Sequence, residues 1–358
     1  MLKILHHLVE TFIKKGGREM LNKILFFCFL LSITSCNKDN PVSPDGNNQQ
    51  PAESTEDKWV AKADMPTARG YFCGLEVNGK MYLFGGLLSI SSNNSDAVEV
   101  YDPETDKWTI KNKMPEKIFG QAAVELNGKI YIFGGRTGNL FSGTSLNHTY
   151  LYDPDADSWT TKADMLVAGA FLTASVIDAK IYIIGGSGTG FQGMTTVQMY
   201  DPATDTWTIK AGLDKGRALP TANVFNGKIY VIGGGTSSTN SAGTAFADFD
   251  VYDPLSDSWN SKQNIAQARI GHGSVVINNK LYICGGFTSD SIELKDLSEY
   301  DFNNDKWTTR TSMPSPRRCF ISCVYNGKFF IFGGVSGPQG SQLILKSVMA
   351  YTPPSASN

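Results

Sequence analysis

The sequence predicts an all-β protein built from six repeated units. The stretch NGKMYLFGG at residues 78–86 recurs in five near-copies, which begin at Asn127, Asp178, Asn226, Asn278 and Asn326. A tyrosine follows each Gly-Gly pair, and each of the six tryptophans stands 26 residues before the first glycine of a pair. Because a repeat near fifty residues is one unit of a stacked or closed body, we expect one folded domain.

Composition agrees with a globular protein and excludes one broad class of function. The 358 residues are 41% hydrophobic and 18% charged, which suits an all-β domain better than a disordered chain. The formal net charge is −2, from 32 basic and 34 acidic residues. A general nucleic-acid binder has a strongly basic surface, so we expect no nucleic-acid partner.

Residues 1–36 form a predicted export signal. A basic region with Lys23 precedes an apolar run from Ile24 to Ile33, which is too short to span a bilayer as a stable helix. The ITSC string that ends at Cys36 resembles the lipobox of bacterial lipoproteins, which implies lipidation of Cys36 and an acyl anchor in a membrane. The alternative is an ordinary cleaved signal. Because residues 1–19 delay the apolar run, Met20 is a candidate translation start.

Residues 37–56 form a predicted flexible tether. They are rich in Asn, Gln, Pro, Ser and acidic residues and have no apolar periodicity. A chain of about twenty such residues spans roughly 25 Å. The CNKDN string partly resembles the export signal of surface lipoproteins of the Bacteroidetes. We therefore expect a bacterial outer-membrane lipoprotein, facing the periplasm or the cell surface.

Each repeated unit contains two predicted hairpins. The first has Asn-Gly or a near equivalent in its turn, between two apolar runs, and it ends at the glycine pair. The second joins a strand with the repeat tyrosine to a strand with the tryptophan, and Asp-Pro begins its turn in four units. These hairpins give four antiparallel strands per unit. Periodicity alone is compatible with a solenoid or a closed ring.

The six sets of Gly-Gly, Tyr and Trp resemble the kelch repeat. The resemblance covers residues 57–352 and implies a six-bladed β-propeller with four-stranded antiparallel blades around a central channel. Residues 353–358 form a short tail. Trp59 has no glycine pair before it and Tyr351 has no tryptophan after it, so the N-terminal strand is expected to complete the last blade and close the ring.

Small residues indicate where the channel lies, and loops of variable length indicate which face of the propeller binds a ligand. Small residues stand eleven positions before each glycine pair, where the innermost strands converge: Gly74, Ala123, Ala174, Ala222, Ser274 and Ser322. The spacing from the first glycine to the repeat tyrosine is 16, 18, 15, 19, 15 and 18 residues, so one loop per blade varies in length. We expect the ligand on the face that carries these loops.

Arginines are the strongest candidate ligand-binding residues. Four of them occupy one repeat position in consecutive blades, namely Arg69, Arg217, Arg269 and Arg317. In the kelch propellers that this chain resembles, arginines at this point hold acidic ligand groups, and a guanidinium suits a carboxylate because it donates two parallel hydrogen bonds. Arg136 and Arg318 extend the predicted arc. The alternative is a structural role in which these arginines bind backbone carbonyls.

Aromatic and histidine side chains complete the predicted site. Tyr71 and His272 stand near the arginine positions, and Phe141 and Phe191 belong to the variable loops, as do Phe246 and Phe287. Aromatic rings next to polar groups are able to stack on sugar rings, whereas some of these side chains are expected to anchor their own loops.

We expect no cofactor and no metal. Copper oxidases on a kelch propeller need paired His and Tyr ligands, and only His148 and His272 lie in the predicted propeller. The acidic DPDADSW stretch at Asp153 is interpreted as a capped turn, because it lacks the glycine and the final Glu of a calcium loop. Two states are possible for the cysteines: Cys73 forms a disulfide with Cys319 or Cys323, or all of them are buried free thiols.

Two functions follow from these observations. The first is a lipid-anchored, monomeric binding protein that captures an acidic glycan or an acidic peptide or protein and has no catalytic residue. The second is a sugar-modifying enzyme, because the resemblance includes the sialic acid mutarotases (N-acetylneuraminate epimerases) of bacterial envelopes. That reaction needs a general acid and base, and no carboxylate directly follows any glycine pair. Binding is the preferred prediction.

Overall fold

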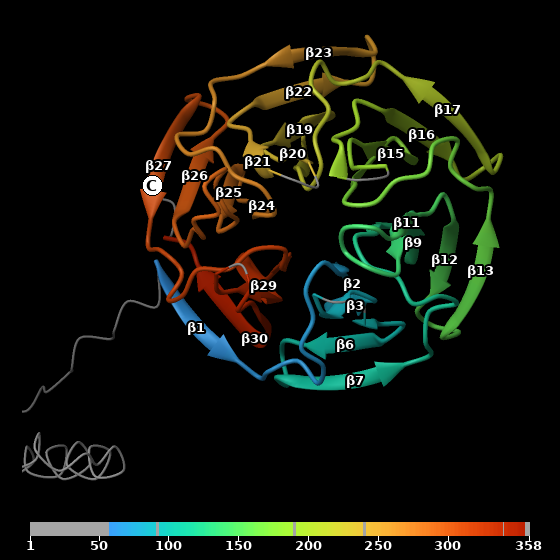
Figure 1. Cartoon of the computed structure of the whole chain (residues 1–358), viewed down its shortest axis with the longest axis horizontal. Coiled ribbons are helices and arrows are strands. Elements are labelled where there is room, and N and C mark those ends of the chain that lie inside the picture. The colour runs from blue at the N-terminus through green and yellow to red at the C-terminus, as the bar shows by residue number, and fades with distance from the viewer. Residues whose placement is uncertain (1–56, 91–92, 189–190, 239–240, 339, 355–358) are drawn as a thin grey trace, which may run out of the picture. The chain divides into compact units, whose positions relative to one another are not determined.

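The computed structural model describes residues 57–90, 93–188, 191–238, 241–338 and 340–354. The predicted signal and tether (1–56) and residues 355–358 of the predicted tail lie outside the described residues. Six four-stranded antiparallel sheets form a ring (Figure 1). The predicted all-β, six-bladed propeller is confirmed.

Each blade contributes its strands from the channel outward. Blades 1 to 3 consist of β2 (Cys73–Val77), β3 (Lys80–Phe84), β6 (Val98–Asp102) and β7 (Lys107–Lys111); β8 (Ala122–Leu126), β9 (Lys129–Phe133), β12 (Thr149–Asp153) and β13 (Ser158–Lys162); and β14 (Thr173–Ile177), β15 (Lys180–Ile184), β16 (Val197–Asp201) and β17 (Thr206–Lys210). Blades 4 to 6 consist of β18 (Thr221–Phe225), β19 (Lys228–Ile232), β22 (Phe249–Asp253) and β23 (Ser258–Ser261); β24 (Gly273–Ile277), β25 (Lys280–Cys284), β26 (Leu297–Asp301) and β27 (Lys306–Arg310); and β28 (Ile321–Tyr325), β29 (Lys328–Ser336), β30 (Leu343–Thr352) and β1 (Lys58–Lys62).

Ring closure follows the sequence prediction. Strand β1 pairs antiparallel with β30 (Figure 1). In this pairing Trp59 lies opposite Tyr351. The hydroxyl of Tyr351 donates to the carboxylate of Asp57 at 2.6 Å. The same carboxylate accepts from the backbone N–H of Thr311 in blade 5 at 3.2 Å. The N-terminal strand therefore covers the sheet edge of blade 6 and joins two blades.

The repeat residues also hold neighbouring blades together. In blade 3 the hydroxyl of Tyr200 donates to Asp205, and that carboxylate accepts from the backbone N–H of Ala163 in blade 2 at 2.9 Å. The indole N–H of Trp207 donates to the carbonyl of Ala163 at 2.9 Å. The corresponding nitrogen of Trp307 in blade 5 is buried and has no hydrogen-bond partner among the described residues. The contacts between blades 4 and 5 therefore differ from this pattern.

The loops of variable length contain strands that the sequence did not predict. Three loops fold back as two-stranded sheets: β4 (Leu87–Ser89) with β5 (Asn93–Asn94), β10 (Arg136–Thr137) with β11 (Thr144–Ser145), and β20 (Gly235–Ser238) with β21 (Ser241–Ala245). In blade 6, β29 continues through its glycine pair and pairs again with β30. These additions rest on loop backbone pairing, which has no periodic apolar pattern for sequence analysis to detect.

Candidate functional site

A closed ring of backbone hydrogen bonds surrounds the channel on the variable-loop face. In each blade, the residue two positions after the repeat arginine position donates its N–H to the carbonyl of its counterpart in the preceding blade. These six bonds measure 2.5 to 3.3 Å and join Tyr71, Gly120, Phe171, Leu219, Gly271 and Cys319. All six residues have φ between 52° and 67°, which is strained for the four that are not glycine. We call this ring the mouth.

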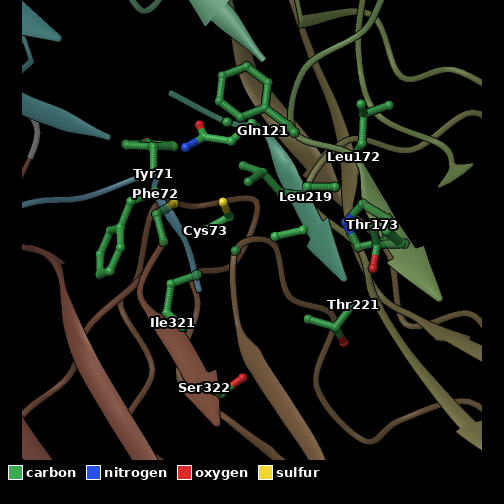
Figure 2. Close-up of a pocket in the computed structure, with 18 of the residues that line it drawn as sticks. Tyr71, Phe72, Cys73, Gln121, Leu172, Thr173, Leu219, Thr221, Ile321 and Ser322 are labelled. Carbon is green, nitrogen blue, oxygen red and sulfur yellow. The ribbon is translucent and has the colours of Figure 1, made fainter. Parts of the chain in front are cut away.

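Beside the mouth lies a cavity of about 230 Å³, lined by residues from all six blades. The small residues that the sequence placed at the axis all belong to this lining. Figure 2 shows Thr173, Thr221 and Ser322 around the space, together with the sulfur-bearing Cys73. The lining therefore combines hydroxyls and small residues with larger apolar side chains such as Leu172, Leu219 and Ile321.

The titratable groups of the lining are not poised for acid-base chemistry at neutral pH. Burial lowers the pKa of His272 to about 3, with a smaller contribution from Arg269. Its Nε2 lies 2.9 Å from the hydroxyl oxygen of Thr221. Burial raises the pKa of the Cys73 thiol, and it raises that of Cys319 to about 11. Burial also raises the pKa of Tyr71, and the described lining contains no carboxylate.

The four repeat arginines are buried inside their own blades. Each donates from Nη1 to the carbonyl of the first glycine of its blade, at 2.9 to 3.5 Å. Arg69 also pairs with Glu99 at 2.6 Å, and these side chains are 0% and 1% exposed. The remaining pairs are Arg217 with Asp250 at 2.6 Å, Arg269 with Asp296 at 2.6 Å, and Arg317 with the hydroxyl of Ser347 at 3.1 Å. None of the four lines the cavity.

The main chain of this repeat position has a second structural role. The carbonyl of Arg69 accepts from the N–H of Gly334 in blade 6, and that of Arg217 accepts from Gly186 in blade 3. The side chain therefore bonds its own blade while the carbonyl bonds the preceding one. These contacts support the structural alternative for the four arginines, in which no guanidinium is available to an acidic ligand.

Arg136 and Arg318 occupy different surroundings on the variable-loop face. Arg318 pairs with Glu293, and its Cζ lies 5.4 Å from the ring centroid of Phe287. Arg136 is 0% exposed and forms no ion pair with any described residue. Its Cζ lies 5.2 Å from the ring centroid of Phe171 and 5.1 Å from that of Phe191.

A cluster of aromatic rings extends from the mouth residues Tyr71 and Phe171 to the loops of blades 2 and 3. The rings of Phe171 and Phe191 stack with centroids 4.7 Å apart and an interplanar angle of 17°. Phe141 lies 6.0 Å from Phe191, and Tyr71 lies 5.8 Å from Phe171. Phe141 is 50% exposed, Phe191 and Tyr71 are partly exposed, and Phe171 is buried. We call these four rings the aromatic platform.

The structure therefore combines only part of the predicted site. Tyr71 and His272 line the cavity, whereas the arginines lie behind it in the blades and loops. The sequence pointed to Phe141 and Phe191 in the loops but not to Phe171, the ring on which Phe191 stacks. Cys73, Cys284, Cys319 and Cys323 are buried free thiols, so neither of the open disulfide pairings is present. Cys36 lies outside the described residues.

Two kinds of feature are absent from the part of the chain that the structure describes. No group of three or more His, Cys, Asp or Glu side chains there is arranged to hold a metal ion. Among the same residues, no helix has the length and apolar character needed to cross a bilayer.

Comparison with known proteins identifies the repeat. The family model described as the KLHDC2/KLHL20/DRC7 Kelch-repeats domain matches residues 71–266 and 219–353. A solved structure described as "Structure of YjhT" superposes with a TM-score of 0.68 at 16% sequence identity. That match covers 80% of this chain and 95% of the other, and it shows a shared fold. No curated protein matches the chain.

Proposed function

Because the chain belongs to the kelch-repeat family, we propose that it is a binding protein that captures a glycan on the variable-loop face of its propeller. The observation that carries this proposal is the aromatic platform, which adjoins a cavity whose lining includes several hydroxyls among apolar side chains. Aromatic faces pack against the apolar side of sugar rings, and hydroxyls exchange hydrogen bonds with sugar hydroxyls. This pairing of groups is suited to carbohydrates.

The cavity size indicates how a glycan is held. Sites for drug-sized ligands measure roughly 300–1,000 Å³, and this cavity measures about 230 Å³. It accepts the end of a ligand, while the rest lies across the mouth and the aromatic platform. The acidic character predicted from the sequence has less support, because the repeat arginines are engaged within their blades.

The enzymatic alternative has less support from the site. A mutarotase of the sialic acid type needs a general acid and base near the anomeric carbon. The described cavity lining has no carboxylate, His272 is neutral, and burial raises the pKa values of the lining thiols. Retention of the ligand is the better-supported role.

A glycan array tests the proposal directly. The full-length protein, purified in detergent, is probed against neutral, sialylated and uronic-acid glycans and against acidic peptides. An anomer-exchange assay on sialic acid runs in parallel. We expect retained neutral or acidic glycans and no turnover. Binding to acidic peptides alone contradicts glycan capture, and turnover without retained glycan reverses the preference for a binding protein.

We also propose that Cys36 carries an acyl anchor that holds the protein at the bacterial envelope. Changing Cys36 to Ser removes the lipidated sulfur, so the protein should leave the membrane fraction. Cys28 lies inside the apolar run of the same segment, and Cys28→Ser is the matched control that should remain in the membrane fraction. A Cys36→Ser protein that stays in that fraction contradicts the anchor.

A further inference from the structure

We infer that Arg136 is a positioning residue that holds the aromatic platform in place and does not contact the ligand. The inference rests on the proposed glycan site at the mouth and names how part of it is built. Its consequence is that the outer part of the site, at Phe191 and Phe141, takes the uncharged face of a sugar ring. Two observations carry it: the hydrogen bonds of the guanidinium and the rings that cover it.

The guanidinium joins loops from two blades. Within blade 2, Nη1 donates to the carbonyl of Leu140 at 3.0 Å, and Nη2 donates to the hydroxyl of Ser145 at 3.1 Å. Toward blade 3, Nη2 donates to the hydroxyl of Ser187 at 3.4 Å and to the carbonyl of Gly188. Phe141 directly follows Leu140, and Phe191 belongs to the loop that begins at Ser187. One side chain therefore fixes the loops that carry both outer rings.

Neutral acceptors distinguish Arg136 from the three repeat arginines that pair with carboxylates. Arg317 also has neutral acceptors, but no described aromatic ring lies over its guanidinium as two do at Arg136. A buried guanidinium without a carboxylate depends on several acceptors in fixed directions and on the faces of aromatic rings. Arg136 has both, since its Cζ lies within 5.2 Å of two ring centroids. Lysine has the same charge but lacks the planar fork, so it cannot satisfy the two blades together.

The burial of Arg136 determines what the ligand encounters. The side chain is 0% exposed, and the ligand-facing atoms nearby belong to Phe191 and to the half-exposed Phe141. Contact with these rings is apolar, so binding at this part of the site should depend little on salt. A direct contact between Arg136 and an anionic group would weaken as salt screens it.

The first test needs no ligand. In Arg136→Gln, amide hydrogen exchange in residues 138–146, 187–188 and 191–194 should accelerate at least tenfold, while exchange in the blade 5 and 6 loops stays unchanged. Arg136→Lys should behave like Arg136→Gln. Arg318→Gln is the matched control, and it should change exchange only near Glu293 and Gly337. Unchanged exchange in both Arg136 variants overturns the inference.

The second test uses lactose and 3′-sialyllactose, or the best neutral and sialylated pair retained on the array. Arg136→Gln should weaken binding of both sugars roughly three- to tenfold, in line with the loss of aromatic contacts, with the same salt dependence as the unchanged protein. In a background that carries both Phe141→Ala and Phe191→Ala, Arg136→Gln should have no further effect on affinity. If Arg136→Gln weakens binding of 3′-sialyllactose alone and also removes the salt dependence of that binding, Arg136 contacts the ligand directly and the inference is overturned. If the unchanged protein binds no glycan, the proposed function fails, and hydrogen exchange still decides the role of Arg136.

Discussion

The arginines behind the mouth fall into two regions with different partners. In blades 1, 4 and 5 the repeat arginines pair with carboxylates of their own blade, at 2.6 Å in each case. On the blade 2 and 3 side, Arg136 has carbonyls, hydroxyls and two phenyl rings as neighbours. The groups that contact each guanidinium, and not the presence of an arginine, indicate what that side chain does. A carboxylate of the same blade ties Arg69, Arg217 and Arg269 to the scaffold. The neutral partners of Arg136 instead join loops of two blades.

The largest expected effect is the loss of stability when a repeat arginine that pairs with a carboxylate is replaced. Arg69→Ala leaves Glu99 buried without a partner, so the free energy of unfolding should fall by about 3–5 kcal/mol, measured by urea denaturation. The carboxylates that pair with Arg69, Arg217 and Arg269 are 1%, 15% and 36% exposed. The losses should decrease in that order, because water solvates an exposed carboxylate left alone.

Glycan affinity separates this outcome from the anion-site hypothesis. The folded fraction of each arginine variant should bind as the unchanged protein does. If Arg269→Ala weakens binding at an unchanged melting temperature, the repeat arginines return to the ligand site.

The next effect concerns His272, another residue predicted for the ligand site. The folded protein keeps it neutral to a pKa of about 3, whereas an unfolded histidine titrates near 6.5. The unfolded chain therefore binds the extra proton between these values, and stability should fall as the pH falls from about 6.5 toward 3. The slope from this group is roughly 1 kcal/mol per pH unit.

Leu172 occupies the same repeat position in blade 3, so His272→Leu is a matched change. It should flatten the dependence of the unfolding free energy on pH between 6.5 and 4.5. Thr221→Val removes the hydroxyl partner but keeps the imidazole, and its slope should persist. An unchanged slope in His272→Leu would show that other groups govern acid stability.

Substitution of Phe141 tests whether the aromatic platform contributes to glycan binding. Because half of this side chain is exposed, Phe141→Ala should change stability by less than about 0.5 kcal/mol. Glycan affinity should fall up to roughly tenfold. Leu255 lies in the turn between β22 and β23 on the opposite face and is 93% exposed, so Leu255→Ala is the control. Equal affinity in both variants removes Phe141 from the site.

The smallest expected effect concerns the hydrogen bonds of two repeat tryptophans. The indole N–H of Trp207 donates to a carbonyl of the neighbouring blade, and that of Trp307 has no partner among the described residues. Trp207→Phe should therefore cost about 1 kcal/mol more than Trp307→Phe in thermal or urea unfolding. Equal costs would mean that burial of the ring, and not its hydrogen bond, dominates at both positions.

The sequence predicted the scaffold better than the site because the scaffold is periodic. Six sets of glycines, tyrosines and tryptophans determine the blades, and the unpaired Trp59 and Tyr351 indicate how the ring closes. The sequence also contains a signal for the ion pairs of the repeat arginines. A carboxylate stands two or four residues before the repeat tyrosine in blades 1, 4 and 5, where the arginine also occurs. The aromatic platform has no such pattern, because it depends on how loops of unequal length fold onto each other.

The ring of six backbone hydrogen bonds at the mouth has an electrical consequence. Each N–H points to the carbonyl of the preceding blade, so the dipoles of the six N–H···O=C bonds run head to tail around a circle. Dipoles arranged this way cancel across the ring, unlike those of a helix, whose aligned peptides leave charge at each end. The backbone of this aperture therefore favours neither anions nor cations. Selectivity depends on the side chains mounted on it, and substitution at Tyr71 or Leu219 can change that selectivity without changing the backbone bonds that set the width of the aperture.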